Sequence, residues 1–139
     1  MRLLLWHVDS FVSRVTKRGR SSVYDLEPTP SVSMGEGVLV MASVERDDEG
    51  DPTGVAARAA DEIDRAARGL KARSVTLHSF AHLFAELAAP EVARDVLVET
   101  GRRLADAGYQ VSVTPFGWFN ELEIRAKGHP YSRSARVIR

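Results

Sequence analysis

The sequence has no cysteine in its 139 residues, and this absence excludes several kinds of chemistry. Without thiols there is no disulfide framework, no thiolate metal site and no cysteine nucleophile. Long apolar runs are also missing, and none approaches the ~20 residues that a membrane-spanning helix needs. Residues 1–6 begin like a signal peptide, but His7 and Asp9 interrupt the apolar run and no small-residue cleavage site follows. We therefore expect a cytoplasmic protein that makes no membrane contact.

An excess of charge of either sign is absent too, because nineteen basic residues balance nineteen acidic ones. Net charge therefore gives no reason to expect a nucleic-acid partner, although a local patch could provide one. Hydrophobic residues make up 44% of the chain and charged residues 27%, which are ordinary values for a folded globular protein. A chain of this length has room for one core. We predict a single domain, residues 1–139.

The common catalytic motifs are missing as well. There is no G-x-x-x-x-G-K-[ST] phosphate loop, no H-E-x-x-H zinc helix and no G-x-S-x-G nucleophile elbow. Gly35-Glu36-Gly37 precedes a predicted strand instead of opening a helix, so it is not a dinucleotide-binding fingerprint. We expect neither a bound metal nor a cofactor.

Hydrophobic periodicity predicts strands that alternate with helices. Strands are expected at 3–8, 11–15, 38–44, 74–78, 109–113 and 121–126, and helices at 52–70, 80–87 and 90–107. Asp51 followed by Pro52 is typical of a helix start, and Gly108 suits the left-handed position after a helix end. Residues 16–36 are rich in Arg, Ser, Pro and Gly and predict a long loop, with at most a short strand near Val23 and Tyr24. This order predicts an α/β (α+β) domain in which a mixed sheet, with hairpin-like pairing at both ends, packs against helices.

The four histidines are the first candidates for acid–base or metal chemistry. His78 and His82 have the i, i+4 spacing that can bind a metal on a helix, but His78 falls at a strand end, which argues against a metal site. His82 is either a partly buried histidine satisfied by the backbone or a site residue. His7 and Asp9 share one strand face and could form an oriented base or a structural hydrogen bond.

Two further segments could carry function. Residues 114–120 crowd three aromatic side chains into a Pro/Gly turn between two strands. This turn is either a hydrophobic plug over the sheet edge or a pocket wall with inward-facing backbone groups. The chain from residue 124 onward has no acidic residue and five cations, Arg125, Lys127, Arg133, Arg136 and Arg139. Such a run is typical of a solvated tail and is equally suited to binding phosphates.

Three segments, in order along the chain with Ser43-Val44-Glu45, resemble one known family. They are residues 3–9, the motif Ser79-Phe80-Ala81-His82-Leu83 continued through 86–90, and residues 115–119 followed by Lys127-Gly128-His129-Pro130. The chain resembles the N-terminal editing domain of archaeal threonyl-tRNA synthetases, which is similar in fold to D-aminoacyl-tRNA deacylases. The resemblance covers nearly the whole sequence and leaves no aminoacylating domain, so it implies an excised domain or part of a split system.

The resemblance implies an activity: hydrolysis of mischarged seryl-tRNA(Thr) to serine and tRNA(Thr), with the 2′-hydroxyl of the terminal adenosine helping to activate water. The implied partners are the serine-bearing 3′ end of tRNA(Thr), the aminoacylating domain or chain of threonyl-tRNA synthetase, and a second copy in a homodimer. Two alternatives stay open. One is a D-aminoacyl-tRNA deacylase, and the other is a non-catalytic module for tRNA binding or dimerisation.

The resemblance also implies site residues, in a pocket lined largely by backbone. The implied substrate-binding residues are Ser43, Val44, Ala81, His82, Pro115, Phe116, Gly117, Trp118, Phe119 and Asn120. His82 and Asn120 are expected as catalytic groups that orient the reactants. The family pattern has tyrosine then lysine where this chain has Phe119 and Asn120, and an asparagine carries no charge and cannot act as a base. Phosphate contacts to tRNA are expected at Arg125, Lys127, Arg133 and Arg136.

Overall fold

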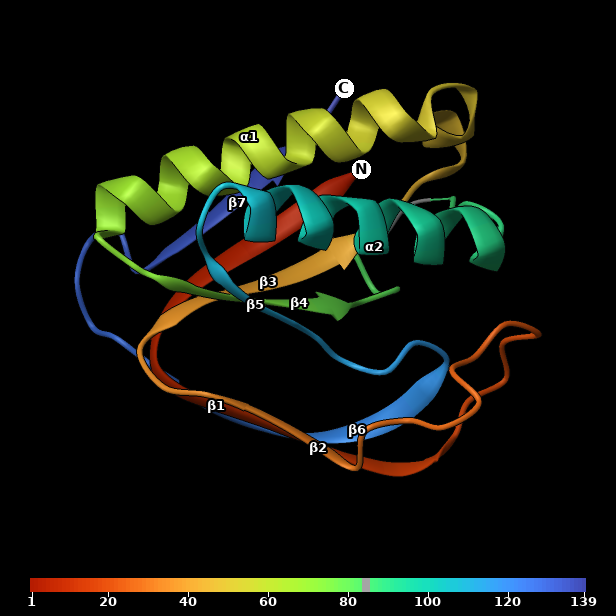
Figure 1. Cartoon of the computed structure of the whole chain (residues 1–139), viewed down its shortest axis with the longest axis horizontal. Coiled ribbons are helices and arrows are strands. Elements are labelled where there is room, and N and C mark those ends of the chain that lie inside the picture. The colour runs from red at the N-terminus through yellow and green to blue at the C-terminus, as the bar shows by residue number, and fades with distance from the viewer. Residues whose placement is uncertain (84–85) are drawn as a thin grey trace.

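The computed structural model describes residues 1–83 and 86–139 (Figure 1). Its elements are β1 (Arg2–Arg18), β2 (Ser31–Met34), β3 (Gly37–Ser43), the short 3₁₀ helix η1 (Arg46–Gly50), α1 (Pro52–Leu70), β4 (Ser74–Ser79), α2 (Pro90–Asp106), β5 (Gln110–Val113), β6 (Trp118–Ala126) and β7 (Arg133–Val137). The strands belong to one mixed sheet, and both helices pack on one of its faces. The predicted α/β (α+β) fold class is confirmed.

β1 is the strand around which the sheet is built. It runs for 17 residues and joins the two strands that were predicted separately at 3–8 and 11–15. β2 and β3 pair along one edge of β1 and β6 and β7 along the other, all antiparallel. β3 then pairs in parallel with β4, and β4 with β5. Neither predicted hairpin is present, because the segments at 3–8 and 11–15 form one strand, and β5 pairs with β4 whereas β6 pairs with β1.

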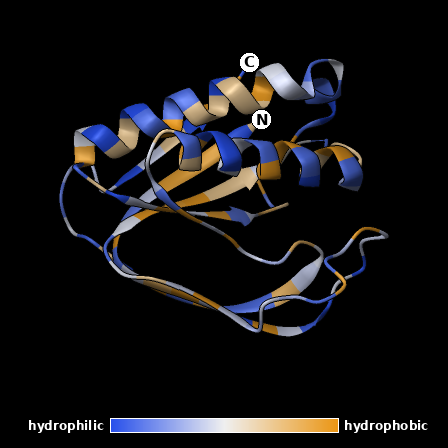
Figure 2. Ribbon diagram, viewed as in Figure 1, coloured by the Kyte–Doolittle hydropathy of each residue, from blue (hydrophilic) through white to orange (hydrophobic). Residues whose placement is uncertain are grey.

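Both helices lie over one face of the sheet (Figure 1), and the strands beneath them are largely hydrophobic (Figure 2). α1 follows the predicted pattern, since Val55, Ala59 and Ile63 are all buried. The Asp51 side chain accepts a hydrogen bond from the Gly54 N–H at 3.0 Å, which caps the helix as predicted. A smaller core, which includes Phe11 of β1, involves the part of β1 that pairs with β6. No helix in the described residues has the length and apolar character needed to cross a membrane.

The prediction of one long loop at 16–36 is wrong. β1 continues to Arg18, and β2 occupies residues that were placed in the loop, while Val23 and Tyr24 are not in a strand. The physical reason is pairing: the end of β1 pairs with β6, and β2 pairs with the middle of β1, which outweighs a local composition rich in turn residues. For the same reason β6 begins at Trp118 and not at 121.

Two other local predictions also fail. The chain end is not a solvated tail, because β7 pairs with β1 and the buried Ile138 donates its N–H to the Met1 carbonyl at 2.8 Å. Exposed and half-buried residues alternate along β7, as expected for a strand with one face toward solvent. The number of cations in this segment does not reveal that pattern. The short helix predicted at 80–87 is absent from its described residues: residues 81–83 form a turn and a bend, and Leu87 forms an isolated bridge with Glu45. Residues 84 and 85 of that prediction lie outside the described residues.

Candidate active site

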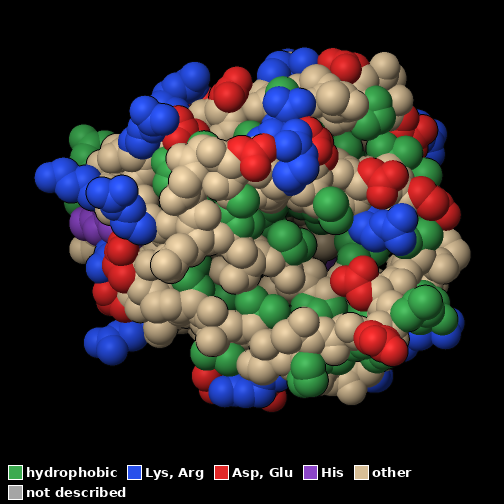
Figure 3. Space-filling view, in the orientation of Figure 1, with side chains coloured by type: hydrophobic (Ala, Val, Ile, Leu, Met, Phe, Trp, Pro, Cys, Tyr) green, Lys and Arg blue, Asp and Glu red, His purple; other side chains and the backbone are tan. Residues whose placement is uncertain are grey.

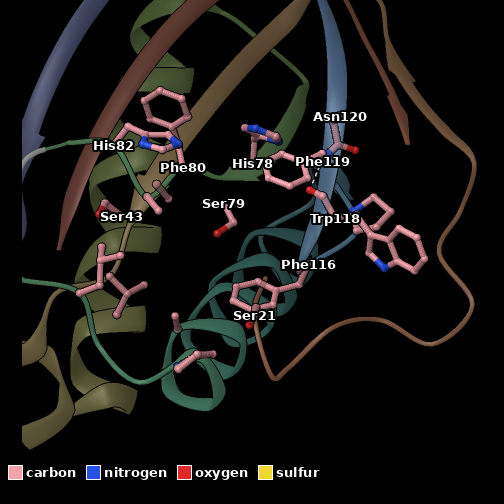
Figure 4. Close-up of a pocket in the computed structure, with 18 of the residues that line it drawn as sticks. Ser21, Ser43, His78, Ser79, Phe80, His82, Phe116, Trp118, Phe119 and Asn120 are labelled. Atoms are coloured by element: carbon pink, nitrogen blue, oxygen red, sulfur yellow. Dashed lines mark hydrogen bonds between the residues drawn. The ribbon is translucent and has the colours of Figure 1, made fainter. Parts of the chain in front are cut away.

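A pocket of about 410 Å³ opens where the C-terminal ends of β3 and β4 meet the start of β6. Figure 3 shows this face of the molecule hollowed below α2, with hydrophobic side chains around the hollow. Figure 4 looks into the pocket and shows side chains from several segments around a common space. Ligand sites in sheets with parallel strands favour the carboxyl ends of those strands. The pocket is therefore the candidate active site.

The structure brings together every residue predicted to bind substrate. The lining includes Ser43, Val44, Ala81, His82, Pro115, Phe116, Gly117, Trp118, Phe119 and Asn120. These residues come from the end of β3, the turn after β4, the connection before β6 and the start of β6. The turn at 114–120 thus forms a pocket wall and not a plug. What these residues bind stays a prediction.

The described lining of the pocket carries no carboxylate, ammonium or guanidinium group: none of its members is Asp, Glu, Lys or Arg. The polar side chains are three serines, one asparagine and two histidines, in the order Ser21, Ser43, His78, Ser79, His82 and Asn120. A carboxylate or a lysine ammonium is therefore not available from this wall as a base or a charge stabiliser. Hydroxyl, amide, imidazole and backbone groups remain for any chemistry.

Ser43 offers an unused hydrogen-bonding group in this wall. Its side chain is 2% exposed, and its Oγ is the one buried side-chain polar atom in the described chain that has no partner. Leaving a buried hydroxyl unpaired costs about 1–3 kcal/mol, so such atoms in native structures call for an explanation. A ligand group in the pocket would supply the missing partner.

Asn120 is held in place by two hydrogen bonds. Its Oδ1 accepts from the Ser13 hydroxyl at 3.1 Å, and its Nδ2 donates to the Trp118 carbonyl at 2.9 Å. One N–H of the amide and part of the acceptor capacity of Oδ1 remain available. The side chain could therefore orient a ligand, and the catalytic role of Asn120 stays a prediction.

His82 does not fit the interpretation of a partly buried histidine satisfied by the backbone. Its side chain is exposed and makes no hydrogen bond with the described residues. Its ring meets the Phe80 ring edge-on, with the ring centroids 5.3 Å apart. His82 lies in the turn after β4 while His78 lies within β4, so no helix presents the two as metal ligands.

His78 is a pocket residue whose importance the sequence did not indicate. It is buried in β4, and its Nδ1 lies 2.8 Å from the Thr114 hydroxyl. Burial lowers the pKa of His78 from 6.5 to about 4, so the ring is neutral at physiological pH. Its position within a predicted strand was the available signal, whereas the i, i+4 spacing to His82 drew attention only to metal binding.

The buried ring makes the stability of the protein depend on pH in a defined direction. Between pH 6.5 and about 4 the unfolded chain binds a proton at His78 that the folded chain does not, so this contribution is complete above pH 6.5 and declines as the pH falls. The full pKa difference corresponds to about 3 kcal/mol. We expect the free energy of unfolding of the wild type, relative to His78→Gln, to fall by this amount between pH 7.5 and 4 in denaturant titrations.

The exposed His82 provides the control for this measurement. His82→Gln makes the same substitution at a ring that is exposed and makes no hydrogen bond with the described residues, so it separates the effect of burial from that of replacing a histidine. Parallel curves for the wild type and His78→Gln would contradict the burial argument.

His7 and Asp9 do not pair with each other, so neither interpretation of them as a pair is correct. His7 Nδ1 lies 2.8 Å from His129 Nε2, and its Nε2 is hydrogen-bonded to the Glu36 carboxylate. Asp9 is bonded to Lys127 at 2.7 Å, and this hydrogen bond is the main reason why the pKa of Asp9 lies below its usual value. Neither residue lines the pocket.

The four basic residues predicted to contact tRNA lie away from the pocket lining. Arg136 is paired with Glu62 of α1 at 2.7 Å, and Arg125 and Lys127 both face the Asp9 carboxylate. The Arg133 guanidinium lies 5.9 Å from the centre of the Trp6 ring. Three of these cations are thus partly neutralised within the fold, and their role in tRNA binding stays a prediction.

The fold is shared with a solved structure of different sequence. The c-Myc DNA Unwinding Element Binding Protein superposes with a TM-score of 0.64 over 99% of this chain and 98% of that chain, at 10% sequence identity. At this identity the likeness shows the common architecture and no more.

Sequence comparison finds a family. Similar curated proteins are threonine–tRNA ligases from Methanothrix thermoacetophila, 37% identical over 139 residues, and from Methanopyrus kandleri, 36% identical over 139 residues. These matches cover 100% and 99% of this chain but 22% of each relative, so the chain spans about a fifth of their length. Residues 1–138 match the archaea-specific editing domain of threonyl-tRNA synthetase. The chain therefore belongs to the family of archaeal threonyl-tRNA synthetase editing domains.

Proposed function

We propose that this chain hydrolyses the ester of mischarged seryl-tRNA(Thr), and so removes serine that threonyl-tRNA synthetase has attached by mistake. The observation that carries the proposal is the pocket, which gathers all the residues that the family resemblance implies for the substrate. We also propose that residues 1–139 act as one editing unit, alongside the aminoacylating part of the synthetase and as a homodimer.

The chemistry of the two amino acids explains why such an activity is needed. A synthetic site that binds threonine cannot strongly reject serine, because a missing methyl group is worth only about 1–3 kcal/mol. A second site must discriminate in the opposite sense, accepting serine and rejecting threonine by steric clash with the extra methyl.

Main-chain amides are the best candidates for binding the ester carbonyl. The N–H groups of Ala81, His82 and Gly117 have no acceptor within residues 1–83 and 86–139, and all three residues line the pocket. Hydrogen-bond donors that face a developing oxyanion strongly stabilise the transition state of acyl transfer. Phe116 differs, because its N–H donates to Asp25 Oδ2 at 2.9 Å and its carbonyl accepts from the Asp25 N–H at 3.0 Å. Phe116 thus contributes its side chain to the wall, and not its backbone.

The reaction we propose needs one water and no ionised protein group. The oxygen of the water adds to the ester carbonyl carbon, the bond from that carbon to the ribose 3′-oxygen breaks, and the 3′-oxygen takes up a proton as serine leaves. The 2′-hydroxyl of the same ribose orients the water and relays its proton. Asn120 and the neutral His78 hold the reacting groups, and the Ser43 hydroxyl binds the polar end of the seryl group. The protein then acts by positioning and by preorganised dipoles.

The test is the choice between the two amino acids. We expect this chain to release serine from seryl-tRNA(Thr) about 10–200-fold faster than threonine from threonyl-tRNA(Thr), because the difference between the substrates is one methyl group. Single-turnover deacylation measures both rates, with spontaneous hydrolysis of each ester as the baseline.

The other outcomes identify the alternatives. Equal rates for the two esters would rule out serine proofreading. Turnover of D-aminoacyl esters alone would show a D-aminoacyl-tRNA deacylase on the same fold. Binding of tRNA without any turnover would show a non-catalytic module.

A further inference from the structure

Three cations border the pocket at the end of β1. Lys17 lies opposite Phe119 of β6 and Arg18 lies opposite Trp118, and both aromatic residues line the pocket. Arg20 directly precedes Ser21, which also lines it. In extended chain the stretch from Lys17 to Arg20 covers about 10 Å. Positive charge is therefore concentrated at one rim of the pocket, next to the start of β6.

These three cations, unlike most others in the chain, are not neutralised by the fold. All three side chains are exposed, and none forms an ion pair with a carboxylate within the described chain. The basic residues near the chain end differ, since Lys127 is 2.7 Å from Asp9 and Arg136 is 2.7 Å from Glu62. Unpaired cations retain their attraction for an anionic ligand.

Aromatic rings hold two of the cations without cancelling their charge. The Arg18 guanidinium lies 4.5 Å from the centre of the Tyr24 ring, which meets the Trp118 ring edge-on. The Lys17 Nζ lies 5.6 Å from the centre of the Phe119 ring, and Phe119 is 49% exposed. Cations beside exposed aromatic faces are what proteins use to bind single-stranded nucleic acid, by pairing with phosphates and stacking on bases.

Hydrogen bonds from the backbone and from one side chain fix this rim to the pocket wall. The Gly19 N–H donates to the Gly117 carbonyl at 2.8 Å, and the Trp118 indole N–H donates to the Asp25 carbonyl at 2.8 Å. Asp25 is the acidic residue nearest to Arg20 along the loop after β1, and its carboxylate already accepts a hydrogen bond from the Phe116 N–H. The cations therefore keep a defined position relative to the pocket.

We propose that Lys17, Arg18 and Arg20 bind the phosphates of the single-stranded 3′ end of tRNA while its terminal nucleotide occupies the pocket. The proposal rests on the proposed function for the identity of the RNA. An ester that reaches this pocket on a tRNA must bring the preceding nucleotides across the rim, and the described rim offers these unpaired cations. The phosphate track is thus assigned to β1 and its following loop, and not to the basic chain end.

The test compares two variants with the same change of charge. One is Lys17→Gln/Arg18→Gln/Arg20→Gln, and the control is Lys71→Gln/Arg73→Gln/Arg139→Gln, three exposed cations that form no ion pair in the described chain and lie outside the pocket lining. Binding of uncharged tRNA(Thr) is measured over a range of salt concentrations. The logarithm of the binding constant falls with the logarithm of the salt concentration, and each lost contact with a phosphate of a single strand reduces the magnitude of that slope by about 0.7. We expect a decrease of about 2 for the first variant and of less than 0.7 for the control.

A second readout separates phosphate binding from chemistry. Seryl-adenosine carries the ester and the ribose but no preceding phosphate. We expect the ratio of kcat/KM for seryl-tRNA(Thr) to kcat/KM for seryl-adenosine to fall at least tenfold in the first variant. The double variant Lys17→Gln/Arg20→Gln keeps the Arg18–Tyr24 contact and serves if the triple variant does not fold.

Three results would overturn the proposal. The first is an unchanged salt slope in the first variant, and the second is an equal loss on both substrates. The third is a weaker salt dependence in Arg133→Gln/Arg136→Gln together with an unchanged one in the first variant. That result would place the phosphate contacts on β7. If the wild type hydrolyses neither substrate, the proposed function fails, and the binding measurement still decides the location of the RNA.

Discussion

Removing the 2′-hydroxyl of the terminal adenosine is expected to slow the protein-dependent release of serine from seryl-tRNA(Thr) by about 10²–10⁴-fold, the usual value of a positioned proton-transfer group. The reason lies in the pocket, whose described lining has no Asp, Glu, Lys or Arg that could take this role. Single-turnover deacylation of tRNA that ends in 2′-deoxyadenosine, with serine on the 3′-oxygen, measures the effect.

Two controls make this result interpretable. The deoxy ester also hydrolyses at a different rate without protein, so the uncatalysed rate of each substrate must be subtracted. Competition by the deoxy substrate against normal seryl-tRNA(Thr) shows whether it still binds. Full turnover of the deoxy ester would mean that the protein supplies the group, and the two histidines of the lining, His78 and His82, would be the residues to examine.

The second large effect is expected at the junction between the loop after β1 and the turn before β6. Gly117 has a φ of +79°, and a Cβ there would lie 2.5 Å from the Val23 carbonyl oxygen and 2.6 Å from the Tyr24 Cβ. Gly117→Ala adds a left-handed backbone penalty of about 1–2 kcal/mol to an overpacking cost of about 1–3 kcal/mol. We expect the free energy of unfolding to fall by about 3 kcal/mol in denaturant titrations and deacylation to be lost, because the wall of the pocket shifts.

Gly128→Ala is the matched control for this change. A Cβ at Gly128 meets no atom within 4 Å, and this residue is not among the glycines with positive φ. Its stability should stay within about 0.5 kcal/mol of the wild type, with deacylation retained. If the two alanine variants behave alike, the close approach of the loop and the turn does not exist in solution.

Elements with local signals could be predicted from the sequence. α1 has a capping Asp51, a proline at its first position and apolar residues at helical spacing, and it begins and ends where these signals place it. β3 has no polar side chain before its last residue, Ser43, and all its residues are buried. β2 and β7 have no such signal, because they are short, half or more of their residues are polar, and each forms by pairing with β1. Pairing between distant segments is not encoded in the composition of either one.

The candidate site also has some features that could be predicted from the sequence and others that depend on the fold. The residues that line the pocket could be named from ordered motifs that resemble a family, and their convergence needed the three-dimensional fold. Two features could not be predicted: the neutral state of His78, which depends on burial, and the unpaired state of the Lys17–Arg20 cations. The sequence counts cations but does not show that Arg136 meets Glu62, which lies 74 residues earlier.

The long strand β1 also links the two hydrophobic cores of the protein. Leu3 and Leu5 belong to the core beneath the helices, while Val8 and Phe11 of the same strand belong to the second core. Neither core can come apart without releasing backbone pairs that the other needs, so partial opening of the molecule between them is disfavoured. A molecule that does not open between its two cores would suit the proposed discrimination, because rejecting one extra methyl group by steric clash needs walls that do not yield.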